Sequence, residues 1–250
     1  MVFVLLFSLL FLSTPGETGQ ADRSVRERAM QPYRQGLQHL RAESWAEAAT
    51  AFQAAIDIDD AFELAYYGLG RACMPQRKFV EAAAALTRSR DLFQAQAGRH
   101  FSDQHEAQRY RRDRLLEIDE TIRQYQTGAQ TMRTQEAIRQ LQEQRRNVQE
   151  RFDRGMTVTI ENSVPGYVSL ALGSAFFRMG RLNDAEREYK AAVAADGRLG
   201  EAHSNLAVVY LEQGRIADAG RSITAAEKAG FRVNPQLKDD ISAAARSGKR

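Results

Sequence analysis

Apolar residues along this chain recur with the spacing of helices, and over two stretches they repeat with one fixed period. The segment 172–176 reads Leu-Gly-Ser-Ala-Phe, and the segment 206–210, which lies 34 residues further on, reads Leu-Ala-Val-Val-Tyr. The segments 179–185 and 213–219 match at the same offset. A period of this length, in a sequence with few strand-forming runs, predicts repeated pairs of helices.

A second pair of matching segments lies in the first part of the chain, where the two copies agree less closely. A small residue, an aromatic residue, an alanine and a bulky apolar residue occur in that order and recur 34 residues later: Gly36, Trp45, Ala48 and Phe52 match Gly70, Phe79, Ala82 and Leu86. The sequence therefore predicts four repeats, arranged as two pairs.

The residue types in each repeat suit two antiparallel helices that pack closely. Glycine or alanine at fixed positions lets the helices approach, and large side chains such as Phe176 and Tyr210 fill the space between them. Gly180 and Gly214 stand where a first helix must end, as expected for a left-handed C-terminal cap. One such pair cannot bury its apolar face alone, so neighbouring repeats are expected to stack.

This pattern resembles the tetratricopeptide repeat (TPR), whose period and order of small and large residues it shares. The most specific matches lie in the third and fourth repeats: Leu172, Gly173, Phe176, Ala185, Tyr189, Ala192, Leu206, Ala207, Tyr210, Ala219 and Ala226. The first two repeats depart further, since His39 and Cys73 stand where the later repeats carry an aromatic residue. The resemblance implies an all-α fold, a TPR α-solenoid of two pairs of helix-turn-helix repeats interrupted by a long helical insertion.

The insertion, residues 97–163, is rich in arginine and glutamine. Two sets of its apolar residues have coiled-coil spacing but are out of phase with each other: Leu115, Ile118, Ile122 and Tyr125, then Ile138, Leu141, Val148 and Phe152. Two helices that break near residues 127–129, each about 35 Å long, resolve this difference and predict an antiparallel hairpin. Two degenerate repeats, or a single long helix that dimerises, are the alternatives.

Both ends of the chain carry further signals. An apolar run over residues 2–12 has the length of a signal-peptide core, although no lysine or arginine precedes it. Asn234 and Pro235 open a short segment that predicts a capping helix over the last repeat. The expected parts are a signal peptide or weak membrane anchor at 1–21, the first TPR pair at 22–96, the insertion at 97–163, the second TPR pair at 164–233, and the capping helix with a frayed tail at 234–250.

Composition and motifs argue against an enzyme. The net charge is only +3 with both signs interspersed, which does not favour a nucleic-acid partner. The single cysteine, Cys73, excludes an internal disulfide, and its apolar helical surroundings predict a buried packing residue. The sequence contains neither a phosphate-binding glycine loop nor a nucleophile elbow, and His100 and His105 are not spaced to share one helical face. We therefore expect no catalytic residue, no cofactor and no metal site.

By the same resemblance, a partner is expected in the concave groove lined by the first helix of each repeat. The candidate groove residues are Tyr33, Leu37, Tyr67, Arg71, Tyr167, Leu170, Ser174, Phe177, Arg178, Asn205, Val208 and Glu212. Aromatic residues with scattered arginines suit a peptide of mixed apolar and polar character. Chaperone-binding members of the family hold a terminal carboxylate with lysine, asparagine and arginine, and the lack of groove lysines disfavours that ligand. The alternative is that some of these side chains pack against the hairpin.

The leading hypothesis is a non-catalytic scaffold or adaptor that binds a protein or peptide segment and is exported, either to the periplasm or out of the cell. Contact with a membrane is expected only through the N-terminal segment, if that segment stays uncleaved. The alternative hypothesis is a structural element that self-associates through the coiled-coil-like residues 103–154.

Overall fold

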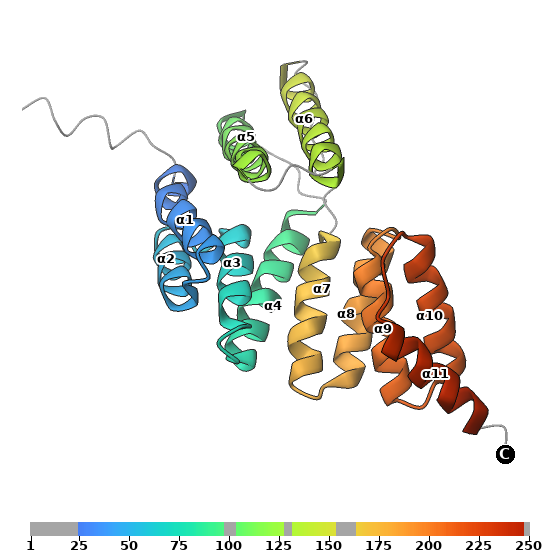
Figure 1. Ribbon diagram of the computed structural model, residues 1–250. Coiled ribbons are helices and arrows are strands. Elements are labelled where there is room, and N and C mark those ends of the chain that lie inside the picture. The colour runs from blue at the N-terminus through green and yellow to red at the C-terminus, as the bar shows by residue number, and fades with distance from the viewer. Residues whose placement is uncertain (1–24, 98–103, 128–131, 154–163, 248–250) are drawn as a thin grey trace, which may run out of the picture.

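The computed structural model describes residues 25–97, 104–127, 132–153 and 164–247 (Figure 1). Every regular element in these ranges is an α-helix, and the predicted all-α solenoid is confirmed. The helices are α1 (Val25–Arg41), α2 (Trp45–Ile58), α3 (Glu63–Cys73), α4 (Phe79–Gln96), α5 (Gln104–Thr127), α6 (Met132–Asp153), α7 (Gly166–Arg178), α8 (Leu182–Ala195), α9 (Gly200–Glu212), α10 (Ile216–Lys228) and α11 (Pro235–Ser247).

Four helical pairs, α1/α2, α3/α4, α7/α8 and α9/α10, stand side by side as a row (Figure 1). The second helix of each pair packs on the first helix of the next pair, and α11 packs on α10 at the end of the row. The first helices α1, α3, α7 and α9 also contact one another in turn. They form one layer. The side of this layer that faces away from the second helices is called the groove face below.

The insertion separates the two pairs of repeats in sequence but not in space. Helix α4 packs directly on α7, and one apolar core runs from the second repeat to the end of the fourth. Polar contacts reinforce the junction, because Arg90 of α4 donates to Glu188 of α8 at 2.9 Å. The guanidinium of Arg178 also lies 5.1 Å from the centre of the Phe79 ring. The four repeats therefore build one continuous solenoid.

Close approach of paired helices depends on small residues, as the sequence predicts. A Cβ atom added at Gly173 would lie 2.7 Å from the Tyr189 ring, and one at Gly70 would lie 2.5 Å from Leu86. Because real Cβ atoms do not come that near a carbon, only glycine allows these contacts. The predicted left-handed caps are also confirmed, since Gly180 and Gly214 have φ angles of 74° and 73°.

Two smaller expectations can be compared with the structure. Cys73 is 5% exposed and lies in the apolar core, where burial raises the pKa of its thiol. Ile241 of α11 is 8% exposed and joins the same core, as expected of a capping helix. The N-terminal segment 1–21 lies outside the described residues. Within the described ranges, no helix has both the length and the hydropathy that a membrane span needs.

We predict that Gly173→Ala destabilises the protein by about 1–3 kcal/mol, because the added methyl group collides with the buried Tyr189 ring. Gly220→Ala in α10 is the matched control, since an added Cβ there meets nothing within 4 Å. The control should gain about 0.4–1 kcal/mol from the reduced entropy of the unfolded chain. Urea unfolding of both variants measures the two changes, and an unchanged Gly173→Ala variant would refute the packing argument.

Candidate functional site

The insertion is described as two helices, α5 and α6, that pack against each other. Arg145 of α6 pairs with Asp119 of α5 at 2.7 Å, which places the middle of one helix beside the middle of the other. The pair lies along one edge of the row of repeats, and α5 is beside the first repeats (Figure 1). The insertion therefore covers part of the groove face.

The apolar side of α5 faces its own chain. Ile118 is 2% exposed and Ile122 is 9% exposed, and Leu116 packs against the core of the first repeat. These residues include part of the seam that the sequence suggests for a coiled coil. Ile118 and Ile122 of that seam are therefore buried within the chain itself, and Leu116 is the apolar residue that joins α5 to the first core.

One buried arginine connects α5 to the first repeats. Arg26 of α1, which is 8% exposed, pairs with Asp59 after α2, with Glu63 at the start of α3 and with Glu117 of α5. It also donates to the carbonyl oxygen of Ala61 at 2.9 Å. We call the four charged residues the Arg26 cluster. All five N–H bonds of a guanidinium can be used in this arrangement, so α5 has a defined position on α1 and α3.

The Arg26 cluster holds three carboxylates around one guanidinium, and Arg114 of α5 adds a second guanidinium at 3.2 Å from Glu117. Glu63 is 2% exposed. Burial, together with the nearby negative charge of Glu117, raises the pKa of Glu63 to about 7, although Arg26 opposes both effects. Glu63 is therefore the carboxyl group of the cluster that takes up a proton near neutral pH.

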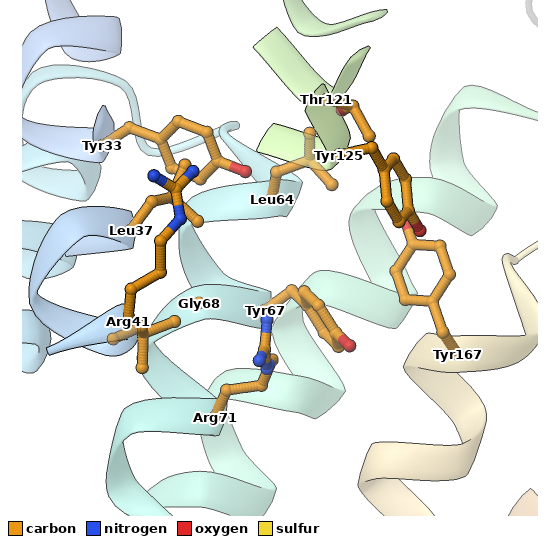
Figure 2. A pocket seen from close by; sticks show the side chains of 11 residues that line it. Tyr33, Leu37, Arg41, Leu64, Tyr67, Gly68, Arg71, Thr121, Tyr125 and Tyr167 are labelled. Carbon is orange, nitrogen blue, oxygen red and sulfur yellow. The ribbon is translucent and has the colours of Figure 1, made fainter. Parts of the chain in front are cut away.

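Next to the cluster, α5 forms one wall of an open pocket of about 480 Å³ on the groove face (Figure 2). Its walls come from α1, α3, α5 and the start of α7. The lining residues are Tyr33, Leu37, Leu40, Arg41, Leu64, Tyr67, Gly68, Arg71, Thr121, Tyr125 and Tyr167. We call this space the tyrosine pocket. Its volume is within the range of about 300–1,000 Å³ that is usual for ligand sites.

Five of the candidate groove residues meet in the tyrosine pocket, but they contribute unequally. Tyr33 and Leu37 are 6% and 8% exposed and belong mainly to the core of the first repeat. Tyr67 and Tyr167 form an edge-to-face pair with ring centres 4.9 Å apart, and Arg71 lies 5.6 Å from the Tyr67 ring centre. Burial raises the pKa of Tyr67, so its hydroxyl group stays protonated and can donate a hydrogen bond.

The other candidate residues lie on α7 and α9 and do not line the tyrosine pocket. Ser174 and Asn205 hold the hydroxyl group of Tyr189, which donates to Ser174 at 3.2 Å. Burial raises the pKa of Tyr189 to about 12. The remaining members of this half are partly or fully exposed: Leu170, Phe177, Arg178, Val208 and Glu212. This half of the groove face is open.

Sequence reasoning does not find the Arg26 cluster or the role of Tyr125. Arg26 and Glu117 are 91 residues apart, and no local pattern relates two such charges. The spacing of Tyr125 predicts a place in a coiled-coil seam, yet this residue lines the tyrosine pocket. His100 lies outside the described residues, and within them no group of three or more potential ligands could hold a metal.

Comparisons with known proteins agree with this architecture. The tetratricopeptide repeat profile matches residues 33–97 and 170–230, which together make half of the chain. The chain therefore belongs to the tetratricopeptide repeat family, whose arrays generally act as non-catalytic scaffolds for protein interaction. No curated protein matches the chain.

Among solved structures, MamA is similar with a TM-score of 0.51 and 13% identity, over 81% of this chain and 78% of MamA. A thermophilic TPR protein of Thermus thermophilus has a TM-score of 0.36 and 20% identity, over 87% of this chain and 98% of its own. The TPR2AB domain of yeast Sti1 in its pHSP90 complex has a TM-score of 0.30 and 14% identity, with the same coverage of 87% and 98%. At this level of identity, the likeness to MamA shows the fold alone.

We predict that the Glu63→Gln substitution removes a specific pH dependence of stability. A carboxyl group whose pKa is higher in the folded chain stabilises the fold fully at low pH and loses this effect as pH rises toward 7. Between its ordinary pKa and pH 7, the wild type should therefore lose up to about 1.4 kcal/mol per pH unit relative to Glu63→Gln. Urea unfolding across this range measures the difference.

The matched control for this experiment is Glu81→Gln, which changes an exposed carboxylate on α4. The free energy of unfolding of this control should differ from that of the wild type by the same amount at every pH. Parallel curves for Glu63→Gln and the wild type would show that Glu63 keeps an ordinary pKa, which would contradict the electrostatics described for the Arg26 cluster.

Proposed function

We propose that this protein is a non-catalytic adaptor that binds a peptide or protein segment along its groove face. The observation that carries this proposal is the arrangement of aromatic side chains there. Tyr67, Tyr125 and Tyr167 surround the tyrosine pocket, and Phe177 lies further along on the open half. Aromatic anchors of this kind contribute most of the binding energy in protein interfaces.

The proposed groove has two parts with different access. Near α1 and α3 the partner meets a pocket that α5 narrows, and near α7 and α9 it meets an open surface. The exposed fraction of Tyr167 is 40% and it stands between the two parts, so a partner that occupies both would cross this side chain. The expected ligand is therefore a peptide segment of several residues that spans both parts.

We predict that Tyr67→Ala and Phe177→Ala each weaken partner binding by about tenfold or more, because each removes an aromatic contact from the groove face. Val80→Ala is the control, since Val80 is 65% exposed on α4, outside the groove face. The full chain is used to capture partners from its native compartment, and each captured partner is then titrated against the variants. Equal binding by the wild type and both groove variants would exclude this surface.

Export is a further part of the proposal. It rests on the apolar run 2–12, which lies outside the described residues. We expect a full-length chain expressed in a bacterium to appear in the exported fraction, with a mass reduced by cleavage near residue 21. Intact-mass measurement checks this, and an uncleaved chain that stays with the membrane fraction would instead support the weak anchor.

Self-association through residues 103–154 is the second candidate function. Half-buried apolar residues of α6, Ile138, Leu141 and Val148, are the feature that favours it. The seam of α5 is less suitable, because Ile118 and Ile122 are already covered by the chain itself. Light scattering separates the candidates, since a strict monomer at high concentration excludes assembly through the insertion.

A further inference from the structure

Arginine side chains along α1 pair with carboxylates of α5 on the first half of the groove face. Arg26, Arg34 and Arg41 lie within about 80° of one another around the helix axis, on one face. Arg26 pairs with Glu117 of α5, and Arg34 pairs with Glu120 of α5 at 2.7 Å. This face of α1 therefore binds carboxylates, and α5 supplies two of them.

The acidic residues of α5 end before the helix reaches the tyrosine pocket. Its last residues, 121–127, read Thr-Ile-Arg-Gln-Tyr-Gln-Thr and contain no acid. Arg41 of α1 and Arg71 of α3 extend from two different helices toward the pocket tyrosines (Figure 2). Neither guanidinium has an ion pair or hydrogen bond with a described residue, and Arg71 has only its contact with the Tyr67 ring.

The lining of the tyrosine pocket thus has two positive charges and no negative one. The rest of the lining is apolar or aromatic, apart from Thr121, and the edge-to-face pair of Tyr67 and Tyr167 forms one wall. Such walls favour insertion of another ring or bulky apolar group. Guanidinium groups at the same pocket favour carboxylates through charge-assisted hydrogen bonds.

We propose that the tyrosine pocket binds an acidic segment of a partner protein, with a bulky apolar side chain inserted among Tyr67, Tyr125 and Tyr167 and neighbouring side-chain carboxylates held by Arg41 and Arg71. This inference rests on the proposed function and specifies the chemistry of the partner at one end of the groove. The carboxylates are internal Asp or Glu side chains, so the segment needs no free C-terminus.

The test selects random peptides, displayed ahead of a carrier protein so that their C-termini are blocked, for binding to the full chain. The expected result is enrichment of peptides that combine Asp or Glu with Phe, Tyr, Trp or Leu. The enriched peptides, synthesised with C-terminal amides, are then titrated by fluorescence anisotropy against variants. The double variant R41E/R71E should weaken binding about a hundredfold, because each lost charge-assisted contact contributes about tenfold.

Two further variants complete the design. Arg28→Glu is the control, because Arg28 is exposed on the opposite face of α1 and should leave binding unchanged. Thermal unfolding establishes that each variant is folded. If the double charge reversal does not fold, R71Q and Tyr125→Ala take its place, and each should weaken binding about tenfold.

The outcomes separate this inference from the proposed function. Enriched peptides without acidic residues, or acidic peptides that bind the arginine variants as well as the wild type, overturn the inference and leave peptide binding intact. If no peptide is selected and the Phe177→Ala variant binds every captured partner as the wild type does, both the inference and the proposed function are overturned. Loss of binding with Arg28→Glu as well would show that net charge and not the pocket attracts the peptides, which also overturns the inference.

Discussion

Each helical pair leaves one apolar face uncovered, and the need to cover that face organises the whole molecule. Helices α4 and α7 meet although residues 97–163 separate them in sequence, because neither pair can end at an open apolar face. The end of α4 and the start of α7 then lie at the same edge of the row (Figure 1). An insertion that leaves and returns at one edge fits two helices packed on each other, and this arrangement brings α5 to the groove face. The position of the tyrosine pocket is thus a consequence of solenoid stacking.

The Arg26 cluster determines where α5 lies on that face. A buried ion pair adds little net stability compared with apolar packing, because both charges lose their hydration. Its effect is on geometry: Arg26 reaches Asp59, Glu63 and Glu117 together only when α5 has one register and one orientation. The excess of carboxylates over guanidinium groups has a further consequence, since it helps to raise the pKa of Glu63 and links the position of α5 to proton uptake. Fold geometry and electrostatics are therefore coupled at this one place.

The repeats could be predicted from sequence because their signal is local. Glycines such as Gly173 and Gly180, at a fixed offset from their equivalents, encode close packing and helix ends within a few residues. The docking of α5 has no such signal, since it depends on side chains 91 residues apart in Arg26 and Glu117. The candidate groove residues stay a prediction, and five of them line the tyrosine pocket. Tyr33, Tyr67 and Tyr167 all line the pocket, but Tyr33 is mostly buried because it also packs in the first core.

The walls of the tyrosine pocket also bear on the conformation of the partner proposed for it. Helix α5 forms one wall through Thr121 and Tyr125, and Glu117 on the same helix keeps its ion pair with Arg26. A partner that leaves this ion pair in place has to enter beside α5. A single side chain inserted from an extended segment meets that condition, while the backbone of the segment continues toward the open surface of α7 and α9. The proposed partner is therefore expected to bind in an extended conformation.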